Sequence, residues 1–158
     1  MLLYEYYQKK QRQMSLVQNK KAYFNYEILE KMEAGIELLG FEVKSLKNGG
    51  GSLDGAHVTI RGREAYVTGM QISPYQPKNT PKEYDPIRNR RLLLTKKEID
   101  KLSGAEGQKG LTIVPLSVYN KGNKLKVEIG VVRGKKKYDK RESIKKRDTE
   151  REIRRNLK

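Results

Sequence analysis

Apolar and polar residues alternate most clearly in residues 124–131. The apolar positions of one segment recur at every second residue: Leu125, Val127, Ile129 and Val131. This period of two predicts a strand with one buried face. The preceding segment, residues 111–119, is branched and aromatic, so a second strand is expected there, and its Pro115 indicates an edge position or a bulge. Residues 121–123 form the turn between them.

Three further segments favour strands. Residues 56–61 and 65–72 are separated by Gly62-Arg63-Glu64, which is a hairpin signal. Residues 23–32 mix aromatic and branched residues with glutamates and favour a strand, although the second half would also suit a helix. Ala34-Gly35 indicates a break after this segment.

Two segments predict short helices. In residues 36–47 the apolar positions are three or four apart, and Asn48-Gly49 supplies a stop. Thr95 is followed three residues later by Glu98, which is a capping box that opens a second helix. Gly104 is expected to end that helix.

About five short strands with an early and a late helix are typical of a small antiparallel barrel. We therefore predict a mainly β protein: an OB-like antiparallel β-barrel with two or three short helices and a basic C-terminal tail. The barrel is expected over residues 19–133, after an N-terminal extension at 1–18 and before a tail at 134–158. OB-like barrels bind nucleic acid on one face.

The charge balance narrows the class of partner. Lys and Arg number 35 against 19 Asp and Glu, a net charge of +16 that indicates RNA, DNA or an anionic membrane surface. No apolar run approaches the length that spans a bilayer, which weakens the membrane alternative. Cys is absent, so disulfides, zinc ribbons and thiol catalysis are excluded and a reducing cytoplasm is expected.

The basic tail contributes disproportionately to this charge. Residues 134–158 contain 12 Lys/Arg and 5 Asp/Glu, a net 12 − 5 = +7. Their aliphatic residues are only Ile144, Ile153 and Leu157, too few to offset the entropy of ordering. We expect a tail that is disordered when free and that orders against a polyanionic partner. The alternative is a solvated tail that only keeps the protein soluble.

A second candidate RNA contact is the loop at residues 73–91. It contains four prolines and ends in Arg88-Asn89-Arg90-Arg91. Long loops inside compact domains are usually functional or mobile, and arginine can bind phosphate bidentately. An exposed loop whose charges serve solubility is the alternative.

Several short runs occur together in an order and spacing that resemble the small protein B (SmpB) family, the bacterial tmRNA-binding or SsrA-binding proteins. The resemblance covers roughly residues 19–148. The runs are Asn19-Lys20-Lys21-Ala22, Tyr26-Glu27-Ile28, Glu33-Ala34-Gly35-Ile36, Glu42-Val43-Lys44-Ser45-Leu46, Arg91-Leu92-Leu93-Leu94, Lys109-Gly110-Leu111-Thr112, Val114-Pro115-Leu116, Lys126-Val127-Glu128-Ile129 and Gly134-Lys135-Lys136-Lys137-Tyr138-Asp139-Lys140-Arg141.

This resemblance implies a barrel that binds the tRNA-like part of tmRNA and rescues stalled ribosomes by trans-translation. The expected RNA-binding residues are Asn19, Lys20, Lys21, Glu33, Leu93 and Lys126. The tail residues expected to act in the decoding centre and the empty mRNA channel, where the tail would be helical, are Gly134, Lys135, Lys136, Lys137, Tyr138, Asp139, Lys140 and Arg141.

The chain departs from the family pattern at two places. Residues 22–26 read Ala-Tyr-Phe-Asn-Tyr where many relatives have Ala-Arg-His-Asp-Tyr, which removes a basic residue. Tyr138 stands where many members carry His, so stacking on a base is retained while a role for protonation is not.

We therefore predict a non-enzymatic, cytoplasmic and monomeric RNA-binding adaptor without a cofactor or metal. One alternative is a general binder of single-stranded RNA with a steep salt dependence. Another is a nuclease, which is disfavoured because the chain has a single His, His57, no Cys and no clustered carboxylate signature.

Overall fold

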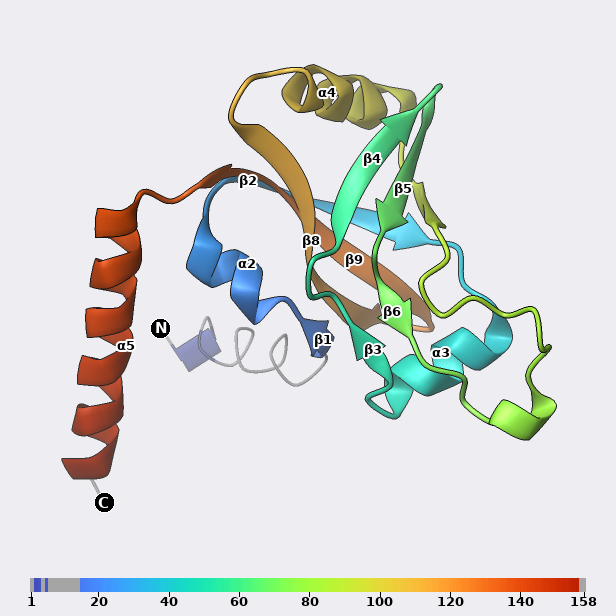
Figure 1. Ribbon diagram of the computed structural model, residues 1–158, viewed down its shortest axis with the longest axis horizontal. Coiled ribbons are helices and arrows are strands. Elements are labelled where there is room, and N and C mark those ends of the chain that lie inside the picture. The colour runs from blue at the N-terminus through green and yellow to red at the C-terminus, as the bar shows by residue number, and fades with distance from the viewer. Residues whose placement is uncertain (1, 4, 6–14, 157–158) are drawn as a thin grey trace.

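The computed structural model (Figure 1) describes residues 2, 3, 5 and 15–156, with residues 137–139 described by their backbone alone. The strands are β1 (Ser15–Gln18), β2 (Tyr26–Ile36), β3 (Gly51–Ser52), β4 (His57–Arg61), β5 (Glu64–Thr68), β6 (Gln71–Ile72), β7 (Arg90–Leu93), β8 (Leu111–Lys121) and β9 (Lys124–Gly134). The helices are α2 (Lys20–Asn25), α3 (Gly40–Lys47), α4 (Lys96–Glu106) and α5 (Lys137–Asn156), with a 3₁₀ turn at Pro77–Asn79.

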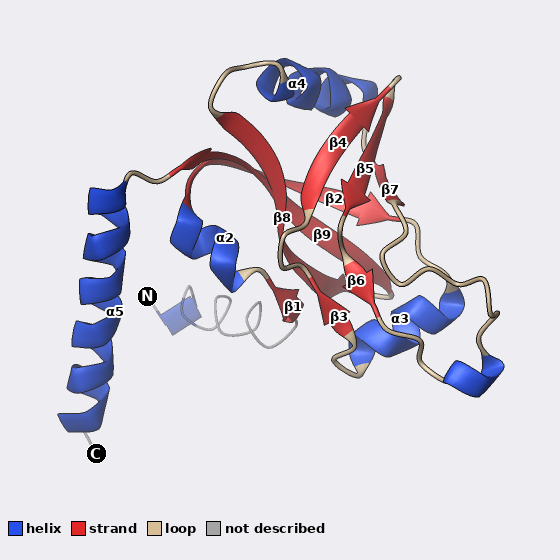
Figure 2. Cartoon of the chain, viewed as in Figure 1, coloured by secondary structure: helices blue, strands red, loops and turns tan. Residues whose placement is uncertain are grey.

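Seven strands form one sheet in the order β1-β8-β9-β2-β7-β5-β4, and every neighbouring pair is antiparallel. The sheet curls until β4 lies against β8, with α4 beside both strands (Figures 1 and 2). β3 and β6 form a separate two-stranded sheet next to α3. The predicted class, a mainly β antiparallel fold with a few short helices, is confirmed, and the curled sheet resembles a partly open barrel.

The alternating apolar positions of β9 are buried, as the sequence pattern predicts, and parts of β8 and β9 bury their other face as well. Val127, Ile129 and Val131 on β9 lie in the main core inside the curl. A smaller cluster lies outside the curl, where α2 covers β8 and β9; its buried members are Ala22, Val114, Leu116 and Val132. The predicted irregularity at Pro115 is confirmed, because the β8–β9 register shifts between Pro115 and Ser117.

The largest local difference from the sequence prediction lies at residues 23–25, which form the second half of α2 instead of the start of a strand. Asn19 caps this helix: its side-chain oxygen accepts from the Ala22 N–H (3.1 Å), and its Nδ2 donates to the Pro115 carbonyl (2.9 Å). The cap and the burial of Ala22 against β8 and β9 outweigh the strand preference of the aromatic residues. The sheet itself begins at Ser15, because β1 pairs with β8, four residues before the predicted boundary.

The bounds of other elements also differ from the prediction. β2 runs through Ala34 and Gly35 without the expected break, because both residues are paired with β9. α3 begins at Gly40 rather than at residue 36, and α4 continues past Gly104 to Glu106. The hairpin of β4 and β5, and the capping box of α4, formed by Thr95 and Glu98, agree with the prediction.

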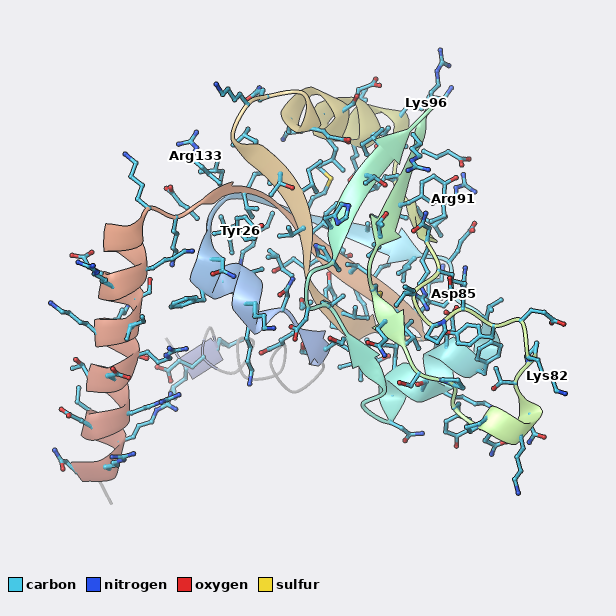
Figure 3. All side chains as sticks on the ribbon, in the orientation of Figure 1. Tyr26, Lys82, Asp85, Arg91, Lys96 and Arg133 are labelled. Carbon is cyan, nitrogen blue, oxygen red and sulfur yellow. The ribbon has the colours of Figure 1, made fainter. Side chains whose placement is uncertain are left out.

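The loop at 73–89 is fixed by a buried cluster of charges. The Glu42 carboxylate, on α3, accepts hydrogen bonds from Arg90 (2.8 and 2.6 Å), from Arg88 and from the Tyr84 hydroxyl (2.9 Å). Both Glu42 and Arg90 are 0% exposed. The hypothesis that these arginines bind RNA phosphate is therefore wrong for Arg90, and Arg88 is also bound to Glu42. The next residue, Arg91, lies at the surface (Figure 3).

Candidate nucleic-acid interface

Three residues predicted to bind RNA meet on the outer face of the sheet. On β2, Gly35 pairs with Leu93 of β7 on one side and with Lys126 of β9 on the other. Glu33 precedes Gly35 by two residues and therefore faces the same side of the sheet. The register thus brings together Glu33, Leu93 and Lys126 from three strands. An added Cβ on Gly35 would lie 3.1 Å from the Leu93 Cβ, so glycine permits this close approach.

The Glu33 carboxylate is held in place by β8. One of its oxygens accepts from the Tyr119 hydroxyl and the other from Lys121 Nζ at 3.0 Å. The hydrogen bond from Tyr119 lowers the pKa of Glu33; partial burial opposes this, and Lys121 and Lys126 lower it further. Burial, the same hydrogen bond and the charge of Glu33 raise the pKa of Tyr119. Glu33 is therefore an ionised, oriented acceptor at neutral pH.

We call the set Glu33, Leu93, Tyr119, Lys121 and Lys126 the outer-sheet patch. Leu93 is 50% exposed, an apolar side chain open to the surroundings. An oriented carboxylate can accept hydrogen bonds from RNA 2′-hydroxyls or base edges, and the lysines can contact phosphates. The patch therefore offers both kinds of contact side by side.

Sequence reasoning missed Tyr119 and Lys121 as part of this patch. Tyr119 pairs with Lys126 across the β8–β9 ladder, and Lys121 lies two residues further on the same face. The sequence signal that could have indicated them was the alternation of apolar and polar residues in the two strands on either side of the turn at 121–123. Their contact with Glu33 depends on β2 lying beside β9, which is a pairing between distant parts of the chain.

The patch continues along β2 towards α2. Glu128 lies directly opposite Glu33, and Lys31 forms an ion pair with it at 3.6 Å. Lys31 Nζ also lies 5.7 Å from the centre of the Tyr23 ring, and Tyr23 is 42% exposed. Burial of part of the ring raises the pKa of the Tyr23 hydroxyl. An exposed aromatic residue beside an ammonium group is a suitable surface for a nucleobase.

The three predicted RNA contacts at residues 19–21 differ in exposure. Asn19 is buried, and its amide is used by the α2 cap and by Pro115, so its role here is to position the helix. Lys20 and Lys21 are the first residues of α2 and are exposed. Direct RNA contacts by all three stay a prediction.

The tail begins where the sheet ends. Gly134 is the last residue of β9 and pairs with Tyr26, and Lys135 and Lys136 connect it to α5. The backbone N–H of Lys135 donates to the Asn25 carbonyl (2.9 Å), and its Nζ donates to Ser143 Oγ (2.8 Å). The side chains of three predicted tail residues, Lys137, Tyr138 and Asp139, lie outside the described residues. Lys140 and Arg141 follow on α5.

α5 runs beside α2 at the edge of the body (Figure 1), where the Arg147 guanidinium lies 5.5 Å from the centre of the Phe24 ring. Most of its described side chains are exposed, including Ile153 at 53%. The helical form agrees with the form that the family resemblance implies on the ribosome. Disorder of the free tail stays a prediction.

Within residues 2, 3, 5 and 15–156, no group of three or more His, Asp or Glu side chains is arranged to hold a metal ion. None of the helices described by the structure combines the length and the apolar character needed to cross a bilayer. The expectation that the protein uses no metal and no cofactor stays a prediction.

The chain is similar to known proteins over most of its length. The family model described as SmpB protein matches residues 16–158. A relative from Elusimicrobium minutum, described as SsrA-binding protein, is 54% identical over 140 residues, which cover 89% of this chain and 88% of the relative. The SsrA-binding protein of Acetivibrio thermocellus is 48% identical over 149 residues, with 94% and 96% covered.

A solved structure, described as "tmRNA-SmpB: a journey to the center of the bacterial ribosome", has a TM-score of 0.64 to this chain at 42% identity. The match covers 80% of this chain and 92% of that one. This likeness agrees with the predicted OB-like arrangement. Taken with the family model, which spans almost all of the described residues, and with relatives near 50% identity, it shows that the chain belongs to the SmpB family.

Proposed function

We propose that this protein is an RNA-binding adaptor that binds the tRNA-like part of tmRNA and delivers it to stalled ribosomes for trans-translation. Membership of the SmpB family supports this function, as do relatives described as SsrA-binding proteins. A solved neighbour whose description names tmRNA, SmpB and the bacterial ribosome supports the same partners. The adaptor carries no catalytic activity and works in the cytoplasm, as a monomer and without a cofactor.

The outer-sheet patch is the observation that carries the RNA-binding half of this proposal. A fixed carboxylate, an exposed leucine and two lysines from four strands form a surface whose geometry depends only on the rigid sheet. Glu33, Leu93 and Lys126 contact the RNA directly, and Lys20 and Lys21 add phosphate contacts at α2. A net charge of +16 draws the polyanion to the body and strengthens binding at low salt.

The tail carries the ribosomal half. Residues 134–141 act in the decoding centre, and α5, which begins within this segment at Lys137, occupies the mRNA channel only when the channel is empty. The support is physical: α5 is highly basic and exposes most of its described side chains, so it gains contacts when it lies against RNA.

Removal of the tail tests this division. A chain truncated after Gly134 should bind a transcript of the tRNA-like part of tmRNA within about twofold of the full chain, since the outer-sheet patch remains. It should lose peptide tagging on ribosomes stalled at the end of a message. As a control, a full-length variant with residues 137–156 in scrambled order keeps the charge and should also fail to tag.

Two outcomes would contradict the proposal. Tagging by the truncated chain would remove the tail from the mechanism. Loss of RNA binding on truncation would show that the body alone does not hold the RNA.

A further inference from the structure

A cavity of about 530 Å³ lies on the other side of α2 from the tail, between this helix, the turn before β4 and the first half of β8. Its floor is apolar and built from small side chains: Ala22, Ala56 and Val114 are each at most 4% exposed. Tyr26, where α2 passes into β2 (Figure 3), supplies part of the wall. Small residues on the floor leave room for a flat ligand.

Three polar side chains line this cavity without an internal partner. Across the residues that the structure describes, no hydrogen bond is formed by the Asn25 amide, the His57 imidazole or the Thr112 hydroxyl. The three come from α2, β4 and β8, elements that are distant in the sequence. Asn19, by contrast, lines the cavity with an amide that is already bonded. Asn25 and Thr112 are partly exposed and His57 is exposed, so their polar atoms are open to a ligand that lies on the apolar floor.

The mouth of the cavity carries one ammonium and one carboxylate. Lys21 Nζ lies 3.5 Å from Asp54 Oδ2, and their side chains are 71% and 53% exposed. An exposed ion pair of this kind contributes little to stability and exchanges partners readily. Lys21 can therefore turn from Asp54 to a ligand phosphate.

We propose that this cavity binds one unpaired, unstacked nucleotide of the RNA that the protein carries. The base lies on the floor formed by Ala22 and Val114, with its edge towards Asn25 and His57, and Lys21 contacts the adjoining phosphate. Sequence-specific RNA recognition commonly uses splayed-out bases that stack on rings and bond through their edges. This inference rests on the proposed function, since it names the part of the RNA that reaches the site next to α2.

A nucleotide fits this site better than an acidic or an apolar ligand. The apolar floor suits a flat ring, and the amide, imidazole and hydroxyl suit the donors and acceptors on the edge of a base. Among the residues that the structure describes, Asp54 is the only carboxylate that lines the cavity, which is too few oxygen ligands for a multivalent cation. The neighbouring Lys20 and the net charge of +16 favour a phosphate chain over a free neutral ring.

Abasic substitution identifies the bound nucleotide. In a transcript of the tRNA-like part of tmRNA, each unpaired nucleotide is replaced in turn by an abasic one, and binding to the full chain is measured. One position should lower the affinity about tenfold, because stacking and edge contacts to a single base are lost. The Asn25→Ala/His57→Ala variant should bind intact RNA about tenfold more weakly than the wild type. It should show no further loss with the abasic RNA at that position.

Asn79→Ala, an amide truncation on the exposed 3₁₀ turn far from this cavity, is the matched control and should bind as the wild type does. Thr112→Val keeps the side-chain volume and removes one hydroxyl, so a smaller loss at the same position is expected without a folding defect. The nucleotide site would be overturned if the affinity losses caused by the double variant and by the abasic RNA simply added. It would also be overturned if no abasic position lowered the affinity of the wild type. Either result would leave the proposed function intact. If the wild type fails to bind the transcript at all, both are overturned.

A separate titration distinguishes a nucleotide within RNA from a free one. The His57 ring is followed by NMR while adenosine, guanosine, cytidine and uridine monophosphates are added one at a time. Binding at millimolar concentrations or weaker is expected, because a mononucleotide lacks the remaining phosphate contacts. Saturation at the concentrations where RNA binds would identify a free nucleotide as the occupant and overturn the proposal.

Discussion

Glu42 and Glu33 have similar partners and different roles. Glu42 accepts from a tyrosine, Tyr84, and from two arginines, and Glu33 accepts from Tyr119 and a lysine. Glu42 is fully buried, whereas Glu33 is exposed on the outer face of the sheet. The first cluster joins α3 to β7 and the 73–89 loop, and the second leaves an oriented carboxylate at the surface, where we propose that it accepts from RNA.

Burial explains the difference. A buried carboxylate without its partners would remain uncompensated in a medium of low polarity, so every oxygen of Glu42 must be bonded inside the protein. An exposed carboxylate keeps lone pairs for an outside donor and can be replaced at little cost in stability. The same chemistry therefore stabilises the fold at one site and is available for recognition at the other.

The largest expected effect is on stability at the buried cluster. Arg90→Met removes the buried arginine that donates two hydrogen bonds to one oxygen of Glu42, and it should lower the free energy of unfolding by about 3–5 kcal/mol. Arg91→Met, at the next residue, removes only exposed pairs with Glu37 and Glu64, so a change of less than about 1 kcal/mol is expected. Urea unfolding of both variants measures the two changes in the free energy of unfolding. Equal losses of stability would show that burial does not determine how much each arginine contributes.

Acid should reveal the same cluster. Burial alone would raise the pKa of Glu42, but hydrogen bonds from Arg88, the Leu39 N–H and Arg90 outweigh it and hold the pKa below the ordinary value of 4.5. A lowered pKa in the folded state means that this stabilisation is present above about pH 4.5 and is lost as the pH falls through the folded-state pKa. The free energy of unfolding should therefore drop below pH 4.5. Glu33→Gln should leave most of this drop unchanged.

A smaller effect, on binding alone, is expected at the exposed site. Glu33→Arg removes the oriented acceptor and should weaken binding of the tRNA-like transcript by about 10- to 100-fold, equivalent to about 1.4–2.8 kcal/mol. The free energy of unfolding should change by less than about 1 kcal/mol. Glu30→Arg makes the same charge change on β2 at a residue that pairs with Lys101, and it should not weaken binding. Unchanged affinity in Glu33→Arg would remove Glu33 from the RNA site.

The smallest expected effect comes from the hydroxyl that orients Glu33. Tyr119→Phe leaves the ion pair with Lys121 and should lower RNA affinity by about 2- to 10-fold, the value of one hydrogen bond. Tyr66→Phe removes a comparable hydroxyl bonded to Glu64 on β5 and serves as the control, with no expected change in affinity. Equal affinities for the two variants would contradict a positioning role for Tyr119.

Local patterns predicted those elements whose stability is local. The β4–β5 hairpin and the Thr95–Glu98 capping box depend on residues close in sequence, and both formed as expected. β7 was missed, because Arg90 reads as a surface residue until its partner Glu42, 48 positions away, is known. α2 was missed because the Asn19 cap and the contacts of Ala22 with β8 and β9 override the strand preference of residues 23–25.

In the candidate site, too, the features that depend on contacts between distant parts of the chain were missed. The family resemblance named Glu33, Leu93 and Lys126, and the strand register explains why they lie together. Leu93 and Lys126 pair with Gly35 from the two neighbouring strands, and Glu33 precedes Gly35 by two residues on β2. The resemblance did not name Tyr119 or Lys121, since their contact with Glu33 arises only when β8, β9 and β2 lie side by side. The resemblance also named Asn19, whose amide is bonded inside the body; a direct RNA contact by this residue stays a prediction.

The central claim is that the body selects one tRNA-shaped transcript. Sequencing the RNA that co-purifies with the full chain from its native cells tests it most directly, with Glu33→Arg purified in parallel. The account predicts that one transcript with a tRNA-like end dominates the wild-type sample and is depleted from the variant. A broad mixture of cellular RNAs, equally abundant in both samples, would contradict it and indicate a general RNA-binding protein.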